Sequence, residues 1–367
     1  MDTTHFIPKP YSYLVDKGSI SCQAPSNIAL VKYWGKYGEQ LPQNASVSFT
    51  LSNCRTETTM RFEKREPTND FQFEVYLDGK REEGFEPKIN KFFERIEQYV
   101  PFIKEYTFKI DTKNTFPHSS GIASSASGMS ALAMCLVELE LRLCKAYRSE
   151  NNAQPVLGGT EWKASFLARL GSGSAARSIE GPLVVWGEHP AIEGSSNLFG
   201  TKYLYEVHEN FTNYQDTILL VDKGEKQVSS TVGHDLMDEN PYAEARFKTA
   251  NDNLSRLISI FKSGDISEFI KIVESEALQL HGMMMASSPY FILMKPNTLE
   301  IINRIWEYRK EAESNICFTL DAGANVHVLY PENEKSKVID FIKNDLAPFC
   351  KNGEFIEDTL GMGASII

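Results

Sequence analysis

Small residues and hydroxyl groups fill the stretch FPHSSGIASSASG, which runs from Phe116 to Gly128. Such a stretch offers many backbone N–H donors and serine hydroxyls, which are groups that hold phosphate. It lacks the Gly-Lys-Ser/Thr ending of the common nucleotide loop, so no lysine stands where a triphosphate would need one. An apolar segment follows and predicts a buried helix, whose first N–H groups and dipole would face the loop near Ser124, Ser125 and Ser127. The stretch predicts a phosphate site that must find further positive charge elsewhere.

Two lysines close to an apolar segment are candidates for that charge. Lys32 interrupts SNIALVKYWG, which otherwise has the composition of a strand, and Lys36 follows with Tyr33 between them. Charged residues within apolar strands often line a cleft. The alternative is a lysine at the end of a strand that extends its ammonium group into water.

Asp321 is the second unusual charge, in the segment CFTLDAGANVHVLY. It ends an apolar strand and precedes Ala-Gly-Ala, a turn whose N–H groups could bind an anion. The alternative is an aspartate that forms the turn or caps a helix, and the local sequence by itself favours this alternative.

A further run of small residues, RLGSGSAARSIEG, extends from Arg169 to Gly181. Its GSGSAA part has a superficial likeness to a dinucleotide-binding fingerprint. That fingerprint follows a strand, whereas this run follows the helical pattern TEWKASFLARL. The run therefore favours an anion-binding helix start beside Arg177.

Composition excludes several classes of function. The chain has 367 residues and a net charge of −11, which argues against nonspecific binding to nucleic acid. Its six cysteines are scattered without a CxxC pair and its seven histidines are dispersed, so neither a disulfide framework nor a zinc site is predicted. No apolar run approaches the roughly 20 residues that span a bilayer, and the N-terminus lacks the pattern of a secretory signal. We expect a cytoplasmic protein without a membrane partner.

Periodicity predicts an α+β fold with two lobes. Alternating apolar residues at 71–79 and 106–112 predict half-buried strands in a β-rich first part. Beyond about residue 205, long amphipathic helical patterns alternate with short strands. We expect an N-terminal lobe at 1–205 and a C-terminal lobe at 206–367, with a deep cleft between them.

Four segments in order, NIALVKYWGK, PHSSGIASSASG, GSGSAARS and TLDAGAN, resemble the diphosphomevalonate decarboxylase family. This family belongs to the superfamily of galactokinase, homoserine kinase, mevalonate kinase and phosphomevalonate kinase. The resemblance implies the two-lobed fold of that superfamily and a homodimer. It also implies decarboxylation of mevalonate 5-diphosphate to isopentenyl diphosphate, with ATP and Mg²⁺, and release of ADP, phosphate and carbon dioxide. ATP is needed because a tertiary hydroxyl is a poor leaving group until it is phosphorylated.

The resemblance also implies roles for individual residues. Asp321 would bind the 3-hydroxyl and accept its proton, and Lys32 would keep Asp321 ionised and stabilise phosphate charge. The implied substrate-binding residues are Tyr33, Lys36, Lys88, Ser172, Ser174, Arg177, Ser229 and Ser230. The implied ATP-binding residues are Asn114, Ser120, Gly121, Ala123, Ser124 and Ser125, with Ser125 also the Mg²⁺ ligand. The residues that contact adenine stay unassigned.

Two positions depart from the family pattern. His118 stands in Pro-His-Ser-Ser-Gly, where the family commonly has Pro-Thr-Ala-Ala-Gly. Lys88 replaces an arginine of the eukaryotic members, which keeps the charge and loses the bidentate geometry. The change at Lys88 leaves a mevalonate 5-phosphate decarboxylase open as an alternative. Two further alternatives are a kinase such as mevalonate 3-kinase and an inactive relative.

Overall fold

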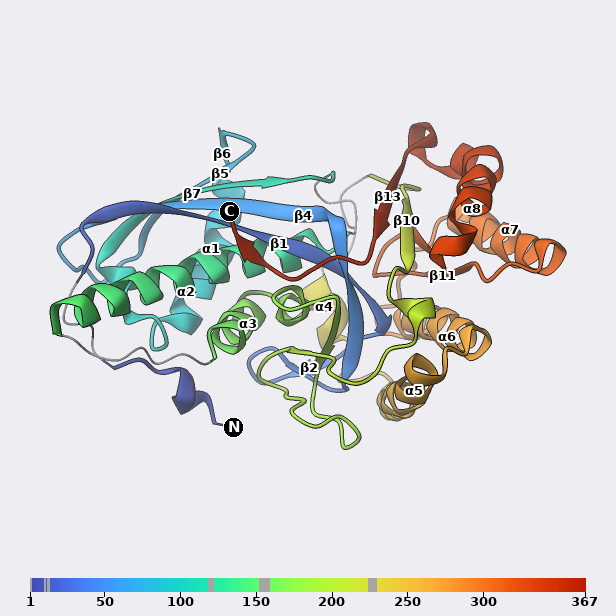
Figure 1. Ribbon diagram of the computed structural model, residues 1–367, viewed down its shortest axis with the longest axis horizontal. Coiled ribbons are helices and arrows are strands. Elements are labelled where there is room, and N and C mark those ends of the chain that lie inside the picture. The colour runs from blue at the N-terminus through green and yellow to red at the C-terminus, as the bar shows by residue number, and fades with distance from the viewer. Residues whose placement is uncertain (1, 10, 12–13, 118–121, 152–158, 224–229) are drawn as a thin grey trace.

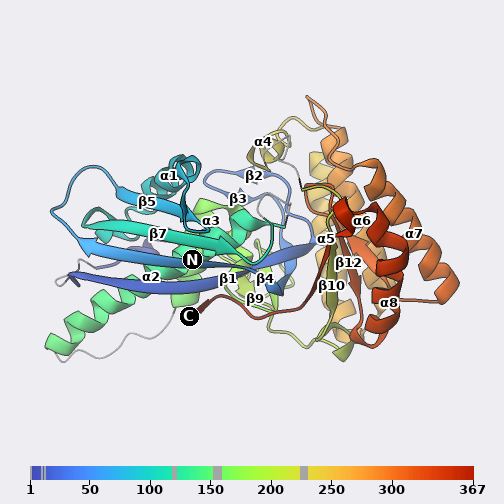
Figure 2. The same cartoon turned by 90° about the horizontal axis from the view of Figure 1, so that it is seen from above.

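The computed structural model describes residues 2–9, 11, 14–117, 122–151, 159–223 and 230–367. Figure 2 shows two lobes side by side, one in the blue and green of the first half of the chain and one in the orange and red of the last third. The predicted α+β class with two lobes is confirmed.

The first lobe is built on a mixed sheet of eight strands. Two long antiparallel strands, β1 and β4, form its middle, and β5 runs parallel to β7. The predicted strands at 71–79 and 106–112 are confirmed as β5 and β7. The strands are β1 (Lys17–Val31), β4 (Ser46–Lys64), β5 (Gln72–Leu77), β6 (Lys80–Arg81), β7 (Tyr106–Asn114), β8 (Leu183–Trp186), β9 (Thr201–Lys202) and β14 (Ser365–Ile366). A separate hairpin joins β2 (Lys36–Tyr37) to β3 (Leu41–Pro42).

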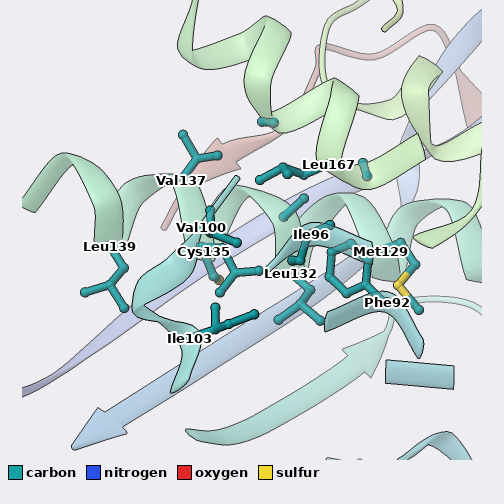
Figure 3. Packing of buried hydrophobic residues seen from close by; sticks show 14 of the residues in the cluster. Phe92, Ile96, Val100, Ile103, Met129, Leu132, Cys135, Val137, Leu139 and Leu167 are labelled. Carbon is teal, nitrogen blue, oxygen red and sulfur yellow. The ribbon is translucent and has the colours of Figure 1, made fainter. Parts of the chain in front are cut away.

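Three helices cover this sheet: α1 (Glu86–Ile96), α2 (Ser124–Asn151) and α3 (Thr160–Gly171). Helix α2 packs along β1 and β4. Figure 3 shows the core around it, where Phe92 of α1, Leu132 of α2 and Leu167 of α3 pack together. The apolar segment after the small-residue loop is therefore a buried helix, as predicted, and its packing holds the N-terminus of α2 in place.

The second lobe has a four-stranded antiparallel sheet in the order β11-β12-β10-β13. Helices α6 and α7 pack against β11, and α5 packs against α6. The helices and strands predicted here from amphipathic periodicity are confirmed. They are β10 (Gln215–Leu219), α5 (Ala243–Ser263), α6 (Ile266–Met285), α7 (Pro296–Ala312), β11 (Cys317–Thr319) and β12 (Val326–Tyr330). The lobe also contains α4 (Ser230–Asp235), α8 (Lys335–Phe341) and β13 (Phe355–Thr359), which were not predicted. In the described part of the chain, no helix combines the length and apolarity that a membrane crossing requires.

The buried side chain of Asp358 joins the two sheets. The carboxylate of Asp358, in β13, accepts hydrogen bonds from the backbone N–H groups of Ser52, Asn53 and Cys54 in β4, at 2.9, 2.8 and 2.7 Å. After β13 the chain returns to the first sheet, where β14 pairs with β1 (Figure 1). The first sheet is thus built from residues 17–202 and 365–366, and the second from residues 215–359.

Candidate active site

A pocket of about 390 Å³ lies where the lobes meet. The residue after β1, the start of α2, the turn after α3 and the loop after β11 all contribute to its wall. The predicted site residues that line it are Lys32, Tyr33, Lys36, Lys88, Ala123, Ser124, Ser125, Ser172, Ser174, Arg177 and Asp321. The four motifs, distant in the sequence, therefore converge on one cavity.

Lys32 and Asp321 form an ion pair in this pocket. The distance from Lys32 Nζ to Asp321 Oδ1 is 3.2 Å, and the side chains are 2% and 27% exposed. The alternative of a lysine that extends into water is wrong, because the ammonium group is buried between the lobes. Burial lowers the pKa of Lys32, and the carboxylates of Asp321 and Glu276 oppose this shift.

The backbone of Lys32 is held from both sides by buried side chains. Its N–H donates to Glu276 Oε2 in α6 at 2.8 Å, and its carbonyl accepts from Asn44 Nδ2 at 3.0 Å. Glu276 also binds Arg246 of α5. These partners were missed in the sequence, because a glutamate and an arginine on amphipathic helices give no signal of burial.

Arg177 brings a second buried cation to the pocket. Its guanidinium donates to Asn27 Oδ1 at 3.3 Å and to Ser46 Oγ at 2.6 Å, and lies 5.7 Å from the ring centre of Trp186. Burial lowers the pKa of Arg177 to about 10, so the group stays charged at neutral pH. The helix expected beside Arg177 is a six-residue 3-10 helix, Gly173–Ser178, and anion binding at its start stays a prediction.

The start of α2 forms the wall of the pocket that carries the predicted phosphate-binding stretch. The helix begins at Ser124, as expected, and Ala123 before it has a left-handed backbone with φ of 45°. Ser125 Oγ lies 3.3 Å from Ser172 Oγ, which links this wall to the turn after α3. Ser127 is buried instead, with its hydroxyl 2.6 Å from that of Thr56, and does not line the pocket.

The structure gives no side-chain position for some of the predicted residues. Ser120, Gly121, Ser229 and the atypical His118 lie outside the described residues. Ser230 is the first residue of α4, and the structure describes its backbone alone.

A second pocket, of about 240 Å³, adjoins the first and shares Lys88, Ser124 and Ser125 with it. Most of its wall is apolar, from Val75, Leu77, Phe85, Ile89, Ile110, Met129 and Leu132. Asn114 lines this pocket rather than the first, and its Oδ1 accepts from Thr56 Oγ1 at 2.7 Å. An apolar cavity beside a helix N-terminus has the character of a site for an aromatic base next to its phosphates.

Comparison with known families agrees with this geometry. The family model for the diphosphomevalonate decarboxylase-like N-terminal domain matches residues 24–197, and the model for the mevalonate 5-diphosphate decarboxylase C-terminal domain matches residues 217–363. The chain belongs to the diphosphomevalonate decarboxylase family. The family predicted from the four motifs is thereby confirmed.

Relatives in this decarboxylase family match over most of their length. The diphosphomevalonate decarboxylase of Ganoderma lucidum is 29% identical over 344 residues, which are 88% of this chain and 80% of the relative. That of Aspergillus fumigatus is 26% identical over 366 residues, or 94% of this chain and 85% of the relative.

Solved structures of decarboxylases share the fold. The mevalonate diphosphate decarboxylase of Staphylococcus aureus superposes with a TM-score of 0.79 at 27% identity, over 96% of this chain and 98% of the other. A complex of MDDEF with MVAPP, AMPPCP and magnesium gives a TM-score of 0.78 at 28% identity, over 95% of this chain and 98% of the other.

Proposed function

We propose that this protein decarboxylates mevalonate 5-diphosphate with ATP, and releases isopentenyl diphosphate, ADP, phosphate and carbon dioxide. The observation that carries the proposal is the Lys32–Asp321 pair in the same pocket as the start of α2. A site for phosphates and a candidate base thus face one cavity. Both features serve the phosphoryl transfer with which the proposed reaction begins, and membership of the decarboxylase family supports the decarboxylation that follows it.

In the proposed mechanism, Asp321 accepts a hydrogen bond from the 3-hydroxyl of the substrate and takes its proton during phosphoryl transfer. Its carboxylate is partly open to the pocket, which leaves room for that contact. The ammonium group of Lys32 favours the ionised form of the carboxylate and stabilises the negative charge that develops on the phosphate. The bond from the tertiary carbon to oxygen then breaks with its electrons on the departing phosphate. The electrons of the bond to the carboxylate form the double bond as carbon dioxide leaves.

The remaining polar residues of the pocket are proposed to hold the anionic ends of the substrate. Arg177 lies in the pocket as a buried cation and would bind the carboxylate or the diphosphate. The other proposed substrate contacts are Tyr33, Lys36, Lys88, Ser172, Ser174, Ser229 and Ser230.

ATP is proposed to bind across both pockets. The apolar second pocket would take the adenine, and the start of α2 would take the phosphates. The proposed contacts are Asn114, Ser120, Gly121, Ala123, Ser124 and Ser125. The solved complex of MDDEF with MVAPP, AMPPCP and magnesium supports a shared site for both reactants.

The donors of the pocket fit Mg²⁺. The described residues hold no cluster of three or more His, Cys, Asp or Glu side chains, and the start of α2 offers serine hydroxyls instead. Mg²⁺ usually keeps several waters and binds phosphates with one or two protein ligands. Ser125 would supply such a ligand, and the bound ion would neutralise charge on the transferred phosphate.

Two further properties are proposed, the first of them from the resemblance. A homodimer is the common state of the family, and light scattering on the purified chain tests it. A cytoplasmic location suits the use of Cys22, Cys54, Cys135, Cys317 and Cys350 as buried packing residues.

A product assay with ATP and each phosphorylated mevalonate tests the proposed function. We expect carbon dioxide, phosphate and isopentenyl diphosphate from mevalonate 5-diphosphate. A stable 3-phosphorylated product without carbon dioxide would instead identify a kinase. Faster turnover of mevalonate 5-phosphate would identify a monophosphate decarboxylase, the variant that the change to Lys88 leaves open.

A further inference from the structure

His234 of the short helix α4 lines the cleft, and no sequence motif singled it out. The ring is buried and lies against two aromatic side chains. Its centre is 4.2 Å from that of Tyr33 and 4.5 Å from that of Trp34. Contacts with two aromatic rings leave the buried imidazole little freedom to turn.

One hydrogen bond determines the tautomer of this ring. The backbone N–H of Gly35 donates to His234 Nδ1 at 2.9 Å. A nitrogen that accepts a hydrogen bond carries no proton, so the neutral ring holds its hydrogen on Nε2. No acceptor in the described part of the chain takes the Nε2 hydrogen, and the ring borders the pocket. The protein therefore presents a fixed N–H donor at the cleft.

The charges around His234 favour an anion as its partner. Lys36 and Arg177 both act on the ring, and together with burial, the largest cause, they lower the pKa of His234 to about 3. Asp235, the next residue, is engaged with Lys36, with 3.3 Å between its Oδ1 and Lys36 Nζ. His234 is therefore neutral at physiological pH, and it borders the same pocket as these two cations.

We propose that His234 is a substrate-binding residue, which donates its Nε2 hydrogen to a diphosphate oxygen of the substrate between Lys36 and Arg177. The proposal rests on the proposed function and deepens it, because it names a further contact for the anionic end of that substrate. A neutral donor adds a directional hydrogen bond where two cations already supply the charge.

Two amide variants separate this role from a structural one. In His234→Asn the side-chain oxygen takes the place of Nδ1, so the acceptor for Gly35 N–H is kept and the Nε2 donor is lost. In His234→Gln the amide N–H₂ reaches the place of Nε2, and the acceptor for Gly35 is lost instead. Calorimetry without ATP measures the Kd of mevalonate 5-diphosphate and of inorganic pyrophosphate, and steady-state kinetics give KM and kcat.

We expect His234→Asn to weaken binding of both ligands about tenfold, the loss of one hydrogen bond to a charged group. The KM for mevalonate 5-diphosphate should rise in parallel, with kcat and the KM for ATP within roughly twofold of the parent, as for a contact made equally in ground and transition states. His234→Gln should bind both ligands within about threefold of the parent.

The opposite order would overturn the proposal: parent-like binding in His234→Asn and weak binding in His234→Gln would mean that His234 acts by holding α4 to Gly35. Equal losses in both variants would also overturn it, since packing of the ring would then be the cause. A parent protein that binds pyrophosphate and not mevalonate 5-diphosphate would refute the proposed function alone, because the pyrophosphate comparison still tests His234. A parent that binds neither would refute both.

Discussion

Two buried ion pairs meet at Lys32 and differ in how far their carboxylates are exposed. The outer pair is Lys32 with Asp321, and the inner pair is Arg246 with Glu276. The side chain of Lys32 binds Asp321 in the cleft, and its backbone N–H binds Glu276, the partner of Arg246, behind the cleft. The Arg246 and Glu276 side chains are 2% and 0% exposed, whereas that of Asp321 is 27% exposed.

In the inner pair, Arg246 and Glu276, the carboxylate is saturated with hydrogen bonds. Glu276 Oε1 accepts from Arg246 Nη1 at 3.0 Å and from Asn253 Nδ2 at 2.7 Å, and Oε2 accepts from the Lys32 backbone. Its carboxylate has no further capacity for a ligand. Asp321 reaches the pocket with part of its surface, where a substrate can approach. The comparison teaches that burial alone does not mark a catalytic carboxylate. The inner pair fixes the backbone of Lys32, and the outer pair is available for chemistry. The outer pair should therefore control turnover, and the inner pair stability.

Asp321→Asn should have the largest effect on turnover. The amide keeps the size and polarity of the side chain but does not accept the hydroxyl proton. We expect kcat to fall about 10²- to 10⁴-fold, the usual contribution of a general base. The binding of ATP and substrate should change little. Release of ADP and of carbon dioxide measures turnover, and calorimetry measures binding.

The matched control is Asp252→Asn, which makes the same change on the exposed side of α5 and should leave kcat as in the parent. Turnover of Asp321→Asn within a few-fold of the parent would remove Asp321 from its role as the base.

Lys32→Met should lower turnover next most strongly, by about 10²-fold, because it removes a cation from a buried site where charge develops. The folded protein should persist, since the side chain that remains fills the same space and Asp321 is partly hydrated. We expect a free energy of unfolding within about 1 kcal/mol of the parent. Loss of folding without a separate kinetic effect would contradict this prediction.

The pH dependence of Lys32 has a definite sign. Its pKa in the folded protein lies below the ordinary value of 10.5 because of burial. The unfolded chain then binds more protons between the two pKa values, so this lysine makes stability rise with pH in that window. Activity should move in the opposite direction, because kcat/KM falls as the ammonium group loses its proton. Lys32→Arg should flatten the alkaline limb of the pH–rate profile, since arginine stays charged.

Periodicity predicted most of the fold because it is a local property. Strands such as β5 and helices such as α6 show their apolar faces within a single window of sequence. The two-residue strand β14 is too short to show a pattern, and it belongs to the first sheet through its pairing with β1. The buried carboxylate of Asp358 likewise depends on β4, far away in the sequence.

The residues of the site were predictable from the sequence only where they belong to one of the motifs. Local sequence left the place of Lys32 open and favoured a turn-forming Asp321, and the contact between them spans 289 positions of the chain. The motifs named residues that line the pocket, but not the buried partners that hold them, such as Glu276. His234 was missed because its tautomer depends on the backbone of Gly35, a contact across 199 positions.

Glu276→Gln should lower stability strongly and turnover little, which is the opposite of the result expected for Lys32→Met. The amide oxygen can still accept from the Lys32 backbone, but Arg246 is left buried without a carboxylate. We expect a loss of about 3 kcal/mol or more in the free energy of unfolding, the usual result of breaking a buried pair on one side. Turnover per folded molecule, measured well below the lowered Tm, should stay within a few-fold of the parent. A variant as stable as the parent and without turnover would erase the distinction between the two pairs.

Lys248→Met should have the smallest effect, and it is the matched control for Lys32→Met. Lys248 pairs with Asp252 at 2.8 Å, one turn along α5, but the two side chains are 79% and 61% exposed. Water and salt screen such a pair, so its removal should change neither Tm nor kcat measurably. Both substitutions remove one positive charge from a protein of net charge −11. If Lys248→Met lost turnover as Lys32→Met does, the overall charge of the protein would be the cause. Parent-like turnover in Lys248→Met assigns the loss to the place of Lys32 beside Asp321.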